Sequence, residues 1–318
     1  MPARLPPFVY HPAYSCPWPA QHRFPMWKFA RLHEQLTAFG LITPANLHTP
    51  TSPPHAWFTA VHDADYYSDF MNGELGAPRE RRIGFNEETR LPALIERTRL
   101  ECAGTVLTVQ LALQHGVCAN LGGGTHHAHR DFGSGFTILN DLAVGARWAI
   151  EHAGVQRVAV IDLDVHQGDG TASIFAEDPR VFTCSMHCGK NFPFRKSESD
   201  LDVDVPPHTR DHEYMAMLRP TLKHILSTFK PELVLYDAGV DVWEGDQLGH
   251  LSLTHAGIWH RDWFVVDSCL RAGIPIACVI GGGYDRDAIA LARRHAMVHR
   301  VVAVAWERHA LHTKESNL

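Results

Sequence analysis

Apolar residues recur along the chain with two different spacings, and their order predicts an alternating series of helices and strands. Apolar positions three or four residues apart predict amphipathic helices, and continuous apolar runs of about five residues predict buried strands. Helices are expected over 26–39, 92–115, 138–152, a short stretch after Gly168, 255–272 and 286–296, and strands over 117–121, 157–162, 181–186, 233–236 and 274–280. The Pro-, Thr- and His-rich residues 41–62 are expected to form a connector.

Buried strands that alternate with helices are typical of a parallel sheet covered on both faces. The chain shows no internal repeat and no linker that would divide it. We therefore expect a single α/β domain over 1–318, a doubly wound parallel sheet with helices on both faces.

Composition narrows the classes of function. The 318 residues are 45% hydrophobic, which is enough for a large core and excludes a disordered chain. The net charge of −6, without a run of Lys or Arg, argues against direct nucleic-acid binding. Seven irregularly spaced cysteines are typical of reduced thiols, and neither a signal peptide nor a membrane-spanning run is visible. We expect a cytoplasmic protein that does not bind membranes.

The chemically distinctive residues follow the predicted strands. Ligands of open parallel sheets bind beyond the carboxyl ends of the strands, where the loops converge. His126 and His127 follow the strand 117–121, Asp162, Asp164 and His166 end or follow 157–162, Asp237 and Asp241 follow 233–236, and Tyr284 follows 274–280.

Asp164 and His166 are two residues apart at a strand end, so their side chains point to one side. Asp241 on a neighbouring strand would complete three ligands with an open position, which is how catalytic zinc sites are built. A surface pair is the plain alternative, but these residues end strongly apolar strands, where an unpaired carboxylate is costly. Cys184 and Cys188 could suggest a second zinc site; core thiols are favoured because no second cysteine pair accompanies them.

The twin histidines follow three glycines. Glycines permit a tight turn near a bound group, and Asp162 and Asp169 could orient the two imidazoles. A phosphate-binding loop is disfavoured, since no Lys-Ser/Thr pair follows the glycines. Tyr284 also follows three glycines, and we expect it to face the site rather than the core.

At this point the motifs resemble a known family. LGGGTHHAHRDFGSGFTILND, VIDLDVHQGDGT, TCSMH, DAGVD, GDQLGHLSLT and IGGGYD occur in this order and look like the zinc-dependent histone deacetylase family of the arginase/deacetylase fold. With HPAY, HRFPMWKFARL and CGKNFPFRKSESDLDV, the chain is most similar to bacterial members and to the class IV branch. The resemblance covers nearly the whole chain.

The resemblance implies a role for each matching residue. It assigns one catalytic Zn²⁺ to Asp164, His166 and Asp241, the general base to His127 with His126 as its partner, the orienting carboxylates to Asp162 (for His126) and Asp169 (for His127), and the transition-state hydroxyl to Tyr284. It further implies a substrate tunnel at Gly135, Phe136, Phe192 and Leu248, an internal acetate pocket at Arg23, and a structural K⁺ at Asp162, Asp164, His166, Ser185 and Met186.

The resemblance implies a zinc-dependent amidohydrolase that removes acetyl or longer acyl groups from the ε-amine of lysine in proteins or peptides. Hydroxamate-type zinc chelators are expected to inhibit it. An acetylpolyamine deacetylase is a close alternative that requires acidic groups at the rim, for which Glu87, Glu88, Glu244 and Asp246 are candidates. A long-chain deacylase would need a roomier pocket.

Two more distant alternatives remain. A ureohydrolase of the same fold binds two manganese ions and needs a second Asp, whereas Gly239 stands two residues before Asp241. A non-catalytic zinc-binding scaffold would be expected to have lost Tyr284 or a twin histidine, and the chain retains all three.

The chain departs from the family pattern at two places near the substrate. The acidic residue by which many family members grip the substrate backbone has no clear match in the stretch GFNEETR, where Asn86 and Glu87 are the candidates. His250 stands where many members carry another residue at the rim.

Overall fold

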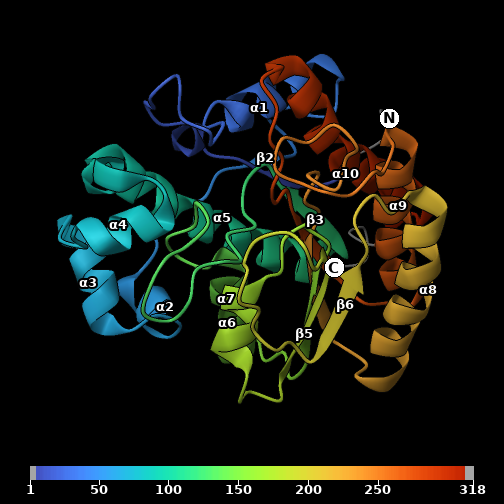
Figure 1. The fold of residues 1–318 in the computed structure, drawn as a ribbon. Helices are drawn as coiled ribbons and strands as arrows, with labels where there is room; N and C mark the ends of the chain where they lie inside the picture. Colours follow the sequence, from blue (N-terminus) through green and yellow to red (C-terminus); the bar gives the residue numbers. More distant parts are fainter. Residues whose placement is uncertain (1–4, 312–318) are drawn as a thin grey trace.

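The computed structural model describes residues 5–311, and its centre is a single sheet of eight parallel strands (Figure 1). The strand order is β2-β1-β3-β8-β7-β4-β5-β6. The strands are β1 Phe8–Val9, β2 Leu47–His48, β3 Val117–Asn120, β4 Val158–Asp162, β5 Val181–Cys188, β6 Leu201–Val205, β7 Leu233–Asp237 and β8 Ile276–Val279. Every residue of β3, β4, β7 and β8 is buried, because these strands occupy the middle of the sheet.

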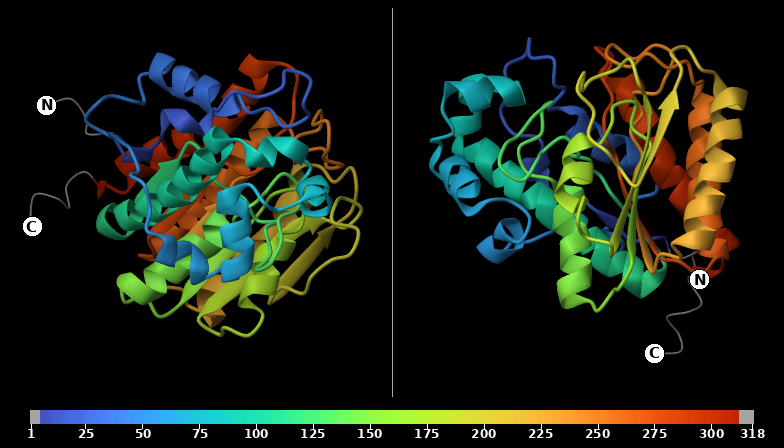
Figure 2. Two further views of the ribbon diagram at one scale, coloured as in Figure 1. Left: turned by 90° about the vertical axis from the view of Figure 1, so that its left-hand side faces the viewer. Right: turned by 60° about the horizontal axis from the view of Figure 1, so that its bottom comes forward.

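Helices cover both faces of the sheet (Figure 2). On one face α5, α6 and α7 contact the strands, and on the other α8, α9, α10 and α1 form the covering layer. The helices are α1 Lys28–Ala38, α2 His55–Thr59, α3 Ala64–Asn72, α4 Ala77–Ile83, α5 Pro92–His115, α6 Asp141–His152, α7 Asp169–Phe175, α8 Asp211–Thr228, α9 His255–Arg271 and α10 Ala288–Arg308, with short 3₁₀ helices at Pro12–Tyr14 and Asn86–Arg90. This is the doubly wound α/β architecture expected from the sequence.

Local chemistry sets the helix ends. Helix α5 begins with Pro92, whose ring suits the first helical turn, and ends at Gly116, which adopts a φ of +94°. At the start of α9 the Thr254 hydroxyl accepts from the Gly257 N–H, and at the start of α10 the Asp287 carboxylate accepts from two backbone N–H groups. Such caps satisfy N–H groups that have no partner within the helix.

The expected strands all form within two residues of their predicted bounds. The prediction for 41–62 as a connector was incomplete, because β2 and α2 lie within it. The last helix was predicted far too short: it continues to Arg308 through a Val-rich stretch that disfavours helix locally but is buried in the core. Residues 1–4 and 312–318 of the expected domain lie outside the described residues.

Between residues 5 and 311, no helix combines the length and the apolar character that a membrane span requires.

Candidate active site

Three predicted metal ligands meet beyond the carboxyl ends of β4 and β7. One ligand atom from each of Asp164, His166 and Asp241 lies within 4.8 Å of the others, and all three residues are buried. His166 Nδ1 is 3.0 Å from Asp164 Oδ1 and 3.2 Å from Asp241 Oδ2. The imidazole thus stands between two carboxylates from different strand ends.

Backbone groups hold the two carboxylates in place. Asp241 Oδ1 accepts from the Val165 N–H at 2.9 Å, and Asp164 Oδ2 accepts from the Gly282 N–H at 2.7 Å. A Cβ at Gly239 or Gly282 would overlap the carboxylate of Asp164. The glycines therefore leave space that the ligand side chains occupy.

The electrostatics of this group favour a cation. Burial, with the Asp164 carboxylate beside it, raises the pKa of Asp241 to about 6. Burial alone would lower the pKa of His166, but its bonds to Asp164 and Asp241 outweigh burial and raise that pKa to about 10. The two carboxylates therefore favour positive charge at the His166 imidazole, where a divalent metal can replace the proton of the ring. Two carboxylates and one imidazole suit zinc and leave a coordination position free.

His127 is oriented for proton transfer by Asp169. His127 Nδ1 donates to Asp169 Oδ1 at 2.6 Å, and His129 Nε2 lies 3.0 Å from the other oxygen of the same carboxylate. Burial and the neighbouring positive charge of His126 lower the pKa of His127 to about 4. The ring is therefore neutral at pH 7, which a general base requires.

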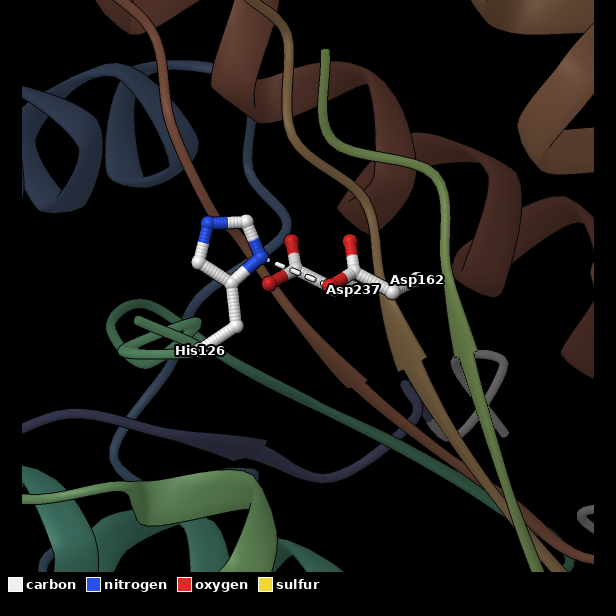
Figure 3. A group of neighbouring side chains, drawn as sticks. All are labelled: His126, Asp162 and Asp237. Carbon is white, nitrogen blue, oxygen red and sulfur yellow. Dashed lines mark hydrogen bonds and ion pairs between the residues drawn. The ribbon is translucent and has the colours of Figure 1, made fainter. Parts of the chain in front are cut away.

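His126 forms the second pair, with Asp162 at the end of β4. His126 Nδ1 donates to Asp162 Oδ2 at 2.6 Å, and the carboxylate of Asp237 lies beside them (Figure 3). Burial lowers the pKa of His126, but the carboxylates of Asp162 and Asp164 outweigh it and raise that pKa well above its ordinary value. The environment thus favours a protonated His126 beside a neutral His127, which is the arrangement of an acid–base pair.

Asp237 is completely buried beside this pair. One of its oxygens accepts from the Gly239 N–H, and the other has no partner among the described residues. Burial and the charge of Asp162 raise the pKa of Asp237 well above its ordinary value. His126, Asp162 and Asp237 form a second group of potential metal ligands, so the number of bound metals needs a direct measurement.

Tyr284 is carried by the loop after β8. Its backbone N–H donates to Asp246 Oδ2 at 2.7 Å, and Asp246 Oδ1 accepts from the N–H groups of Leu248 and Gly249. Burial, together with the charges of Asp241 and Asp164, raises the pKa of the Tyr284 hydroxyl well above its ordinary value. The hydroxyl therefore keeps its proton and remains a hydrogen-bond donor.

A second carboxylate holds the glycine loop that carries the twin histidines. Asp141, the first residue of α6, accepts from the N–H groups of Gly124 and Thr125 and from the hydroxyls of Thr105 and Thr125. It thereby connects α5 and α6 to the loop in front of His126.

An outer pocket of about 740 Å³ leads to these groups. The predicted tunnel residues Gly135, Phe136, Phe192 and Leu248 all line it. The ring of Phe192 lies edge-on to His127 with the centroids 5.0 Å apart. The structure thus brings the four residues together in one pocket with His127.

A smaller cavity of about 30 Å³ lies on the inner side of the same groups. His127, Gly135, Phe136, His166 and Tyr284 line both spaces and so form the neck between them. A substrate entering from outside would present its reacting bond at this neck.

The placement of Arg23 in an internal acetate pocket was wrong. Arg23 is exposed and lines the outer pocket, as does the half-buried His22 before it, whose Nε2 donates to the Gly84 carbonyl. The cations at the inner cavity are Lys28 and Arg97, the latter paired with Glu101 at 2.7 Å.

The other predicted positions include residues of the neighbouring strands β4 and β5. Asp162 and Ser185 are register partners on β4 and β5, and the Ser185 hydroxyl lies 3.0 Å from His187 Nδ1. The potassium expectation at Asp162, Asp164, His166, Ser185 and Met186 has no support from the structure or from similar proteins. Cys184 and Cys188 are buried free thiols on β5.

Sequence reasoning missed several residues that build the site. The motifs predict no role for His129, Asp141, Lys28, Arg97 and Glu101, and they predict Asp246 only as a rim acid. His129 could have been found from the His-His-x-His spacing; Lys28, Arg97 and Glu101 reach the site only through the packing of α1 and α5.

A doubly wound sheet with a carboxylate–histidine group that could hold a metal, two His–Asp pairs and a buried tyrosine is the arrangement expected of a metal-dependent hydrolase. Comparison with known proteins specifies the class, since the histone deacetylase domain model matches residues 22–300. The chain belongs to the histone deacetylase family and is a hydrolase of its deacetylase class.

Individual relatives agree with this assignment. A protein of Picosynechococcus sp. (strain ATCC 27264 / PCC 7002 / PR-6), whose name describes it as uncharacterized, is 48% identical over 294 residues, or 92% of this chain and 97% of its own. Histone deacetylase 2 of Arabidopsis thaliana is 35% identical over 270 residues, covering 83% of this chain and 70% of its own. The acetoin utilization protein AcuC of Staphylococcus aureus (strain MSSA476) is 28% identical over 308 residues, covering 90% and 75%.

Proposed function

We propose that the protein hydrolyses the amide bond of ε-N-acetyl-lysine in peptides or proteins. Asp164, His166 and Asp241 hold one zinc ion, His127 is the general base, and Tyr284 stabilises the oxyanion. The observation that carries the proposal is the neck of the pocket, where His127, His166 and Tyr284 line both the outer and the inner space.

Each residue then has a defined task. When bound, zinc polarises the acyl carbonyl and lowers the pKa of water. Neutral His127 accepts the proton of the attacking water at Nε2, because Asp169 occupies Nδ1. The Tyr284 hydroxyl donates to the oxygen on which negative charge develops. His126, held protonated by Asp162, stabilises that charge, and the proton returns to the leaving amine from the histidine pair.

Two features of the pockets favour acetyl-lysine over the alternatives. The inner cavity is small, at about 30 Å³, and has charged side chains in its wall, which suits acetyl better than a fatty acyl chain. The outer pocket is lined by no Asp or Glu, whereas an acetylpolyamine needs a carboxylate for its second ammonium. Asp246 cannot serve, since its oxygens accept from three backbone N–H groups.

The packing near Asp164 favours one bound metal ion over two. A side chain at Gly239, where a two-metal enzyme would place its additional Asp, would overlap the Asp164 carboxylate. His126 Nδ1 is also already bonded to Asp162. Elemental analysis of protein purified without chelators is expected to show about one zinc per chain; two ions per chain would favour the ureohydrolase-like alternative. The potassium ion remains a prediction.

The test is a turnover panel with an acetyl-lysine peptide, a myristoyl-lysine peptide and an acetylated polyamine. We expect hydrolysis of the acetyl-lysine peptide, inhibition by a hydroxamate, and loss of activity on zinc removal. Tyr284→Phe should lower kcat by about 100-fold to 1000-fold, because it removes one preorganised donor. Asp241→Ala should abolish both activity and stoichiometric zinc binding.

Full activity of Tyr284→Phe or of zinc-free protein would contradict the mechanism. Stoichiometric zinc binding without turnover of any member of the panel would support the scaffold alternative. A strong preference for the polyamine or the myristoyl peptide would change the substrate and leave the residue roles in place.

A further inference from the structure

The mouth of the outer pocket carries an excess of positive charge. Its lining includes the exposed side chains of Arg23, Arg82 and Lys190 and contains no Asp or Glu. The whole chain has a net charge of −6, so this mouth departs from the average surface.

The three cations are available to a ligand. No carboxylate of residues 5–311 forms an ion pair with Arg23, Arg82 or Lys190. The guanidinium of Arg82 lies over the ring of Phe132, 3.3 Å from its centroid, which positions the group without neutralising it. Lys196, on the loop that also carries Lys190, instead donates to backbone carbonyls of its own loop.

An apolar contact point accompanies the charges. Phe194 lines the same pocket and is 93% exposed, the largest value among the exposed large hydrophobic side chains of the described residues. A single exposed ring is common on protein surfaces, but this ring borders the same pocket as the three cations and offers an apolar contact to a ligand that covers the rim. The mouth therefore suits a peptide with negative side chains better than a small cation.

We infer that the mouth selects acetyl-lysine residues whose sequence neighbours are aspartate or glutamate. This inference rests on the proposed function, because the acetyl-lysine side chain must reach the neck while its neighbours remain at the rim. Carboxylates beside the acetyl-lysine would approach Arg82 and Lys190, whereas lysine neighbours, as in a basic protein tail, would be repelled. Such charges act mainly on encounter and binding, since they do not touch the reacting bond.

The experiment compares two peptides of equal length and equal reporter group, one with Asp and one with Lys on both sides of the acetyl-lysine. We expect kcat/KM to be about tenfold higher for the Asp peptide at low salt. The difference should shrink towards 1 M salt, where the Debye length falls to about 3 Å. It should lie in KM rather than in kcat.

Single substitutions of the rim cations test which side chains cause the preference for the Asp peptide. Lys190→Gln and Arg82→Gln should each lower kcat/KM for the Asp peptide about threefold, the size of one partly screened charge interaction, without lowering that for the Lys peptide. Arg81→Gln is the control, because Arg81 is also exposed and adjacent to Arg82 but does not line the pocket. Arg23 is a poorer probe, since its charge also acts on Tyr284.

The outcomes separate the two proposals. Equal kcat/KM for the two peptides, or a preference that Lys190→Gln and Arg82→Gln leave intact, would overturn the inference while the proposed function stands. Absence of turnover for both peptides would overturn the proposed function and the inference with it.

Discussion

Gly135 shows how one residue can control the neck of the pocket. Its φ is +52°, and a Cβ at this position would lie 2.5 Å from His127 Cδ2 and 2.9 Å from the ring of Phe192. Contacts of that length require the neighbours to move. The absence of a side chain therefore lets the rings of His127 and Phe192 occupy the same small volume.

Gly135→Ala is expected to lower kcat/KM by about tenfold or more, since His127 or Phe192 must shift from its place. The matched control is Gly40→Ala, which has a similar φ of +69° but open space around the new methyl group. Both variants should lose about 1 kcal/mol of unfolding free energy from the left-handed backbone alone. Comparison of kcat/KM and of urea unfolding for the two variants separates the steric contact with His127 and Phe192 from the backbone strain. Equal kcat/KM of the two variants would contradict an effect of the steric contact.

At the level of elements, one buried and one half-buried carboxylate connect the strand-end loops that carry the chemistry. Asp141 holds the loop of the twin histidines, and Asp246 holds the loop of Tyr284. Each carboxylate accepts from backbone N–H groups that would otherwise have no partner. The parallel sheet places the loops at one edge, and these carboxylates fix their conformation there.

Asp246→Ala should therefore reduce kcat by about tenfold through misplacement of Tyr284, a positioning effect. In a Tyr284→Phe background the same change should have little further effect on kcat, because the group that it positions is already gone. Additive losses of kcat in the double variant would contradict this dependence.

Asp211→Ala is the control for loss of a backbone-binding carboxylate away from the pocket. Asp211 accepts from the N–H and the hydroxyl of Thr254 at the start of α9. Its removal should lower the free energy of unfolding by about 1–2 kcal/mol and leave kcat unchanged.

The molecule as a whole buries histidines that take no part in the proposed reaction, which makes its stability depend on pH. His62 Nε2 accepts from the Asn140 N–H at 3.0 Å, so its Nδ1–H donates to the His129 carbonyl. Burial lowers the pKa of His62 to about 4 from its ordinary value of 6.5. The unfolded chain therefore binds a proton at a higher pH than the folded protein does.

This difference in pKa makes the folded protein less stable at low pH. The contribution of His62 is fully present above about pH 6.5 and is lost as pH falls towards 4, at about 1.4 kcal/mol per pH unit. His62→Gln should reduce the slope of unfolding free energy against pH in this range, measured by urea titration. His212→Gln on the exposed side of α8 should leave the slope as in the wild type; an unchanged slope in His62→Gln would show that other groups dominate.

Much of this protein follows from the order of its residues. Apolar strands that alternate with helices dictate a parallel sheet, and parallel strands bring their carboxyl ends to one edge. Asp164, His166, Asp241, His127 and Tyr284 therefore converge, as expected from their positions after four strands. The bounds of α10 did not follow, since three of its four valines are held in the helix by burial in the core.

Only the tertiary structure decided which charges face the substrate. Arg23 lies at the mouth, and Lys28 and Arg97 lie at the inner cavity, because α1, α5 and the loop at Gly84 pack together from distant parts of the chain. The sequence determines the residues that end each strand, since that depends on local pattern. The direction of a long, flexible side chain depends on the space that its neighbours leave.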